Sequence, residues 1–172
     1  MSSLCVNALK EWTRKESANI IYDSTVDEFT DQGLFDKVKG KPNVALVGFT
    51  ADGDVFGGFY NIPVTEQKKS FIDPNIFVFS FESNGRCETP QRFVVKDFVR
   101  SYKSVGFDKN DRYGRFVDVG GGTGGLILGN EKSDTSCQNL SRGFVGIADT
   151  TLTGNTHPEK FTCTRIVAVH LQ

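Results

Sequence analysis

The sequence predicts a mainly β protein, a β-sandwich with two short helices packed at its margin. Short runs of β-branched and aromatic residues recur along the chain with turn residues between them, a pattern typical of sandwiches. Phenylalanine, which packs well on a pleated surface, makes up 15 of the 172 residues. Asp52-Gly53 separates two apolar runs, residues 43–50 and 54–60, and an Asp-Gly pair in this setting marks a tight hairpin.

Two helices are expected near the N-terminus. Residues 3–15 place Leu4, Ala8 and Trp12 at a four-residue spacing, which puts them on one face of a helix. A second helix is expected over residues 27–39, where a glycine and a proline follow the last turn.

The hairpin is expected at the centre of the fold. Its arms are apolar nearly throughout, so both faces should be covered, one by the opposite sheet and the other by the helix at 27–39. Two polar stretches, 65–73 and 130–142, are expected to be surface loops. Further strands are expected at residues 19–23, 76–81, 92–98, 115–119, 126–128, 143–147 and 161–171.

Charge and hydropathy bear on the class of partner. Twenty Lys and Arg nearly balance 21 Asp and Glu, so the basic excess typical of nucleic-acid binders is missing. No apolar run approaches the ~20 residues of a membrane span. The first residues do not resemble a secretory signal, so we expect a cytoplasmic protein. In that compartment the four cysteines, at positions 5, 87, 137 and 163, should be reduced thiols.

A glycine-rich segment has the glycine spacing of a cofactor-binding loop, but the residues after it do not fit such a loop. Gly120, Gly122 and Gly125 form a G-x-G-x-x-G pattern directly after an apolar run, similar to the first motif of S-adenosylmethionine-dependent methyltransferases. Such a loop must open a helix whose N-terminal amides hold the ligand. Only residues 126–128 follow before Gly129, which is too short for a helix. A loop that links two strands is therefore expected, and a small methyltransferase stays the alternative.

Other patterns that carry chemistry are sparse. His157 and His170 are not adjacent to each other or to a cysteine in the sequence, and no spacing suits zinc. No catalytic, cofactor-binding or metal-binding residue is predicted. A cysteine nucleophile with a histidine brought close by the fold would make a redox enzyme, which is a second alternative.

The order of the segments resembles a known family. Residues 22–24 read Tyr-Asp-Ser at the end of a short strand, and residues 55–58 read Val-Phe-Gly-Gly in the second arm of the hairpin. This order is similar to the TLDc domain over residues 18–171. Residues 1–17 would then be an N-terminal helix packed on a single domain, residues 18–172. The residues that carry the resemblance are Asp52, Gly53, Phe56, Gly57, Gly58, Gly120, Gly121 and Gly122.

The resemblance implies two antiparallel sheets with a few short helices. It also implies resistance to oxidative stress, binding to the peripheral sector of the vacuolar proton-pumping ATPase, and no agreed catalytic site. We therefore expect a non-catalytic, monomeric protein-interaction domain that uses loops such as 65–73 and 130–142. Val167 and Val169 stand where the family often has Glu and Trp. A function that depends on that Glu would be altered here.

Overall fold

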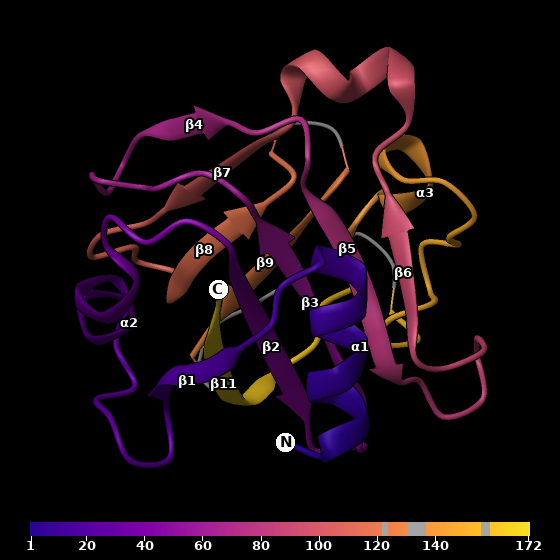
Figure 1. The fold of residues 1–172 in the computed structure, drawn as a ribbon, viewed down its shortest axis with the longest axis horizontal. Coiled ribbons are helices and arrows are strands. Elements are labelled where there is room, and N and C mark those ends of the chain that lie inside the picture. Colours follow the sequence, from indigo (N-terminus) through magenta and orange to yellow (C-terminus); the bar gives the residue numbers. More distant parts are fainter. Residues whose placement is uncertain (122–123, 131–136, 156–158) are drawn as a thin grey trace.

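The computed structural model describes residues 1–121, 124–130, 137–155 and 159–172. Within these residues two antiparallel sheets pack face to face, which confirms the predicted sandwich (Figure 1). The elements are α1 (Ser3–Thr13), β1 (Ala18–Asp23), α2 (Asp31–Val38), β2 (Val44–Thr50), β3 (Val55–Tyr60), β4 (Ser70–Ile72), β5 (Phe77–Glu82), β6 (Gln91–Val94), the 3-10 helix η1 (Asp97–Tyr102), β7 (Ser104–Phe107), β8 (Arg115–Val119), β9 (Gly125–Gly129), β10 (Cys137–Gln138), α3 (Leu140–Gly143) and β11 (Cys163–Leu171).

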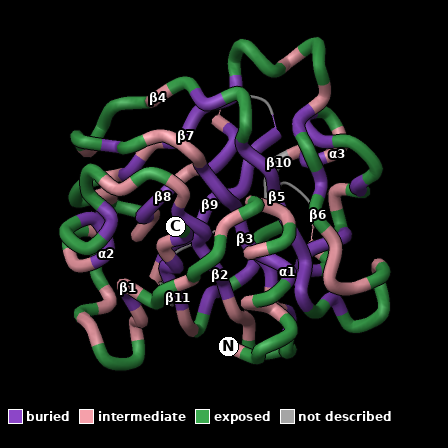
Figure 2. The backbone as a smooth tube through the Cα atoms, viewed as in Figure 1, coloured by how far each residue is buried: buried purple, intermediate pink, exposed green. Residues whose placement is uncertain are grey.

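The last strand completes the larger sheet. The six-stranded sheet has the order β1-β11-β2-β3-β5-β6, so β11 lies between two strands from the first third of the chain. Ala168 pairs with Leu46 on one side and with Tyr22 on the other. The five-stranded sheet has the order β10-β9-β8-β7-β4. Figure 2 shows that burial concentrates on the strands and that the connecting segments are largely exposed.

The main core lies between the sheets. Leu46 and Phe56 of the larger sheet belong to the same buried cluster as Val119 and Leu126 of the smaller one. Gly58 marks a close approach of the two sheets, because a Cβ added there would lie 2.7 Å from Cγ1 of Val119. A side chain at this position would push the sheets apart, which explains why a glycine stands here in the second arm of the hairpin.

A second core lies on the outer face of the larger sheet. It contains Ala45 and Phe59 of the hairpin, together with Ala8 and Leu9 of α1. The hairpin is therefore buried on both faces, as predicted, but the predicted cover was wrong: α1 lies over the outer face. The set of residues predicted to share one packed face of α1 was also partly wrong, because Leu4 is 62% exposed.

The second helix closes a margin of the sandwich instead. Phe35 of α2 packs against Phe107 of β7, with ring centroids 5.5 Å apart. α2 begins later than the predicted residue 27, because Asp27 accepts a hydrogen bond from the Asp23 main-chain N–H (2.9 Å) in a turn. Thr30 caps the helix by accepting from the Gly33 N–H (3.0 Å).

Two predicted strands differ from those observed. Residues 143–147 are not a strand: α3 ends at Gly143, and only Phe144 forms an isolated bridge, with Val95. Gly146 has φ +72°, which breaks an extended run. The strand predicted at 92–98 ends at Val94 and is followed by η1.

Three short strands were not predicted. β4 lies within the stretch expected to be the loop 65–73, and β10 within 130–142. β7 reads Ser-Val-Gly-Phe, a four-residue segment interrupted by a glycine, and it pairs with β8 from Val105 to Phe107. Tertiary pairing decides such strands, so local sequence is a poor guide to them.

Candidate protein-interaction surface

The 3-10 helix η1 projects from one end of the sandwich (Figure 1). It carries two large aromatic side chains, Phe98 and Tyr102, each 73% exposed. Val99, between them, packs against the inter-sheet core, so the helix is fastened to the body of the domain. Val94 and Val145 are also exposed and lie together, since the Val145 N–H donates to the Val94 carbonyl (2.9 Å). We call Phe98 and Tyr102 the aromatic ridge.

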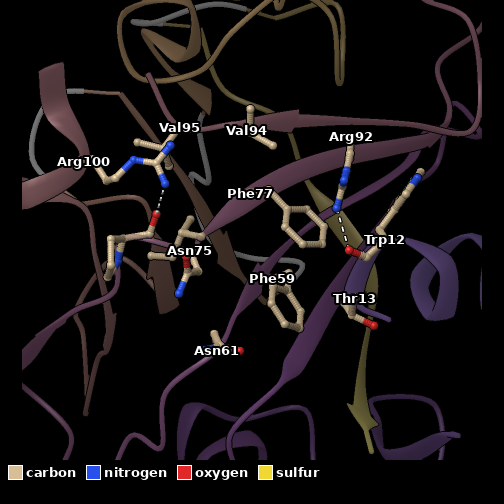
Figure 3. Close-up of a pocket in the computed structure, with 12 residues that line it drawn as sticks. Trp12, Thr13, Phe59, Asn61, Asn75, Phe77, Arg92, Val94, Val95 and Arg100 are labelled. Carbon is tan, nitrogen blue, oxygen red and sulfur yellow. Dashed lines mark hydrogen bonds between the residues drawn. The ribbon is translucent and has the colours of Figure 1, made fainter. Parts of the chain in front are cut away.

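A groove of about 340 Å³ lies beside α1 on the outer face of the six-stranded sheet (Figure 3). Its walls come from the end of α1, from β3, β5 and β6, and from η1. The lining residues are Trp12, Thr13, Phe59, Asn61, Pro74, Asn75, Ile76, Phe77, Arg92, Val94, Val95 and Arg100.

The floor of the groove continues a cross-strand row of apolar side chains. Strand register places Ala45 beside Phe59, Phe59 beside Phe77, and Phe77 beside Val94. The solvent-exposed fraction of the residues rises along this row from 0% at Ala45 to 44% at Val94. Trp12 of α1 meets Phe77 edge to face, with centroids 6.2 Å apart. The helix thus covers the middle of the apolar face and leaves its edge open.

Two arginines give the groove a positive wall. Arg92 donates to the Trp12 carbonyl (2.5 Å), and its guanidinium lies 5.7 Å from the centre of the Phe77 ring (Figure 3). Arg100 donates to the Pro74 carbonyl (3.5 Å) and forms an ion pair with Asp97 (3.0 Å), whose side chain is 96% exposed. Among the described residues that line the groove, none carries a carboxylate.

The residues that carry the family resemblance lie elsewhere. Asp52 and Gly53 form the exposed tip of the β2–β3 hairpin, where Gly53 has φ +91°. Phe56 is buried between the sheets. Gly57 lies under the ring of Phe79, because an added Cβ would be 2.6 Å from its Cζ atom. With Gly58, these residues position the strands around the groove but do not line it.

Strands β8 and β9, which flank the glycine segment, pair antiparallel as a hairpin. Strand β9 stands where a cofactor-binding loop would need a helix. Gly120 and Gly121 have positive φ, and Gly122 lies outside the described residues. Two polar side chains hold the hairpin: Lys103 donates to the Gly124 carbonyl (2.5 Å), and Asp118 accepts from the Gly121 N–H (3.2 Å). Burial lowers the pKa of Lys103 and raises the pKa of Asp118 to about 6.

Of the cysteines that the structure describes, Cys5 and Cys87 are free thiols. Cys163 is buried, whereas Cys5 and Cys87 are half-buried. The side chain of Cys137 and the whole of His157 lie outside what the structure describes. Within the described residues, no three His, Cys, Asp or Glu side chains group as they would around a metal ion.

A buried ion pair that sequence spacing did not reveal ties the hairpin tip to two distant turns. Asp54 is 2% exposed and pairs with Arg86. Asp54 also accepts from the side-chain amide of Asn84 (2.7 Å). Arg86 donates in addition to the carbonyls of Thr151 (3.2 Å) and Leu152 (3.1 Å).

The Tyr-Asp-Ser segment joins β1 to the C-terminal strand. Asp23 accepts two hydrogen bonds from the guanidinium of Arg165, and Ser24 accepts one from the Ile166 N–H (3.0 Å). The hydrogen bond from Arg165 lowers the pKa of Asp23 from 3.8 to about 2.

We expect this lowered pKa to make the domain acid-sensitive. A carboxyl whose pKa is lower in the folded state contributes stability above its unfolded pKa and loses it as the pH falls toward the folded value. The pair is partly exposed, so its contribution should be about 1–2 kcal/mol, lost between about pH 4 and pH 2. Urea unfolding should show Asp23→Asn less stable than wild type at pH 7 and equal to it near pH 2. Asp52→Asn is the matched control, because Asn-Gly suits the same turn. A constant difference across this range would contradict the assignment.

The comparison with protein families agrees with the fold. The family model of the TLDc domain matches residues 2–159, so it includes α1 and ends before β11. No curated protein matches the chain.

Val167 and Val169, at the positions where Glu and Trp were expected from the resemblance, lie in the outer-face core with Ala8 and Leu9. No helix in the described part of the chain is long and apolar enough to cross a membrane. The chain belongs to the TLDc domain family.

Proposed function

We propose that this chain is a non-catalytic protein-interaction domain that binds the peripheral sector of a vacuolar proton-pumping ATPase. The domain would act as a monomer in the cytoplasm, and this binding would contribute to resistance to oxidative stress. Membership of the TLDc family supports a role in protein interaction. The near balance of charges, 20 Lys and Arg against 21 Asp and Glu, favours a protein partner over nucleic acid.

The observation that carries the proposal is the aromatic ridge. In the folded domain most of the apolar surface of Phe98 and Tyr102 stays in contact with water. A bound partner would bury this surface. Aromatic anchors of this kind supply much of the energy of protein interfaces. The groove lies next to the ridge, because Arg100 of the same helix η1 lines the groove.

Replacing the ridge tests the proposal. Purified peripheral sector should bind immobilised wild-type domain, and the double variant Phe98→Ser/Tyr102→Ser should bind at least about thirtyfold more weakly, because the loss of even one anchor worth about 2 kcal/mol weakens binding by that factor. Tyr113→Ser, which removes an exposed tyrosine from the turn before β8, should bind like wild type. Thermal unfolding checks that all variants fold. A folded wild-type domain that does not bind the sector, or a ridge variant that binds normally, would refute the proposal.

A further inference from the structure

We infer that the groove beside α1 binds an extended acidic segment of the partner protein, with one apolar side chain seated on the floor. The inference rests on the proposed function only in that the domain acts by binding another protein. It adds the chemistry of the segment that is recognised.

The floor accounts for the apolar side chain. Phe59 and Phe77 are stacked, with centroids 4.7 Å apart, and are only 4% and 5% exposed, so they form a fixed surface. Trp12 of α1 and Val94 of β6 also line the groove beside this surface. A volume of about 340 Å³ lies at the small end of the range for ligand pockets and holds a short stretch of chain.

The positive wall accounts for the acidic residues. Arg92 is held in place by the Trp12 carbonyl and the Phe77 ring, so little side-chain freedom is lost when its other N–H groups bind a carboxylate. Arg100 forms an ion pair with Asp97, whose side chain is 96% exposed, and such an exposed pair is weak enough to exchange for a partner's carboxylate. With no carboxylate in the lining, nothing within the groove repels an acidic segment.

The amide side chains account for an extended main chain. Asn61 and Asn75 line the end of the groove nearest Arg100, and within the described residues neither side-chain amide has a hydrogen-bond partner (Figure 3). Each amide offers both a donor and an acceptor. These are the groups that the unpaired N–H and C=O of a bound extended peptide require.

Fluorescence anisotropy with a labelled probe peptide tests the inference. The probe is a short peptide with a central phenylalanine flanked on both sides by aspartates. Wild-type domain should bind it, and should bind the version with asparagines, or the version with serine for phenylalanine, at least about tenfold more weakly. Arg100→Glu should weaken binding of the aspartate peptide about tenfold, whereas Lys39→Glu, an exposed charge reversal at the end of α2, should not. Raising the salt concentration should weaken wild-type binding.

The outcomes separate this inference from the proposed function. If the ATPase sector binds the domain but the aspartate peptide does not, the acidic-segment inference is wrong and the function stands. If the peptide binds as expected but the sector does not, the groove chemistry holds and the choice of partner is wrong. Equal affinity for the aspartate and asparagine peptides would overturn the inference. Binding to anionic phospholipid vesicles in place of the peptide, abolished by Arg100→Glu, would also overturn it in favour of a membrane surface.

Discussion

Phe56→Ala is expected to lower the free energy of unfolding by about 3–5 kcal/mol, the usual cost of truncating a fully buried phenylalanine. Phe56 is 0% exposed, lies in the inter-sheet core and meets Phe161 edge to face, with centroids 5.2 Å apart. Its loss leaves a cavity where the hairpin meets the C-terminal segment. For a chain of this length the unfolding midpoint should fall by roughly 10 °C.

Lys68→Ala is the control for this experiment. Lys68 is exposed and contributes its main-chain N–H to the Phe107 carbonyl (2.7 Å), a bond that alanine keeps. Its effect on the free energy of unfolding should stay within about 0.5 kcal/mol. If Phe56→Ala unfolds within about 2 °C of wild type, the hairpin is peripheral and the architecture described above is wrong.

Arg86→Ala is expected to lower the free energy of unfolding by a similar amount, because a buried charge loses its partner. The substitution leaves the carboxylate of Asp54 buried without its cation and removes the donors to the Thr151 and Leu152 carbonyls. Breaking a buried pair from one side costs about 3–5 kcal/mol. Urea unfolding of the single variants and of Asp54→Ala/Arg86→Ala forms a double-mutant cycle.

The cycle gives a clear expectation for the pair. The double variant should lose less stability than the sum of the two single variants, because neither charge is left alone. Strictly additive losses would show that the two side chains do not stabilise each other. Lys68→Ala, the exposed substitution described above, again serves as the control and should change the stability little.

Features set by neighbouring residues could be predicted from the sequence. Asp52-Gly53 and the apolar runs beside it identify the β2–β3 hairpin, because turn chemistry and strand pattern are local. The short run after Gly125 correctly indicated a strand where a cofactor loop would need a helix. Features set by packing could not be predicted in the same way. Whether α1 or α2 covers the outer face depends on how the chain turns between elements, and both helices carry apolar residues.

The candidate site belongs to this second group. Trp12, Phe59, Phe77 and Arg92 come from four separate elements, and the strand register together with the packing of α1 on the sheet brings them together. The aromatic ridge was missed because Phe98 was assigned to the end of a strand, where its side chain would have been a candidate for the core. Its position after Lys96-Asp97 could have warned against that, since two charged residues interrupt the apolar pattern.

Hydrogen exchange in the complex tests the central claim most directly, namely that this domain binds its partner through the face made by α1, β6 and η1. Adding purified peripheral sector should slow exchange of the backbone amides in residues 91–102 and in the last turn of α1. The glycine hairpin and the tip at Asp52 should exchange as in the free domain. Slowed exchange at the glycine hairpin, with no change in residues 91–102, would contradict the claim and move the interaction surface to the opposite sheet.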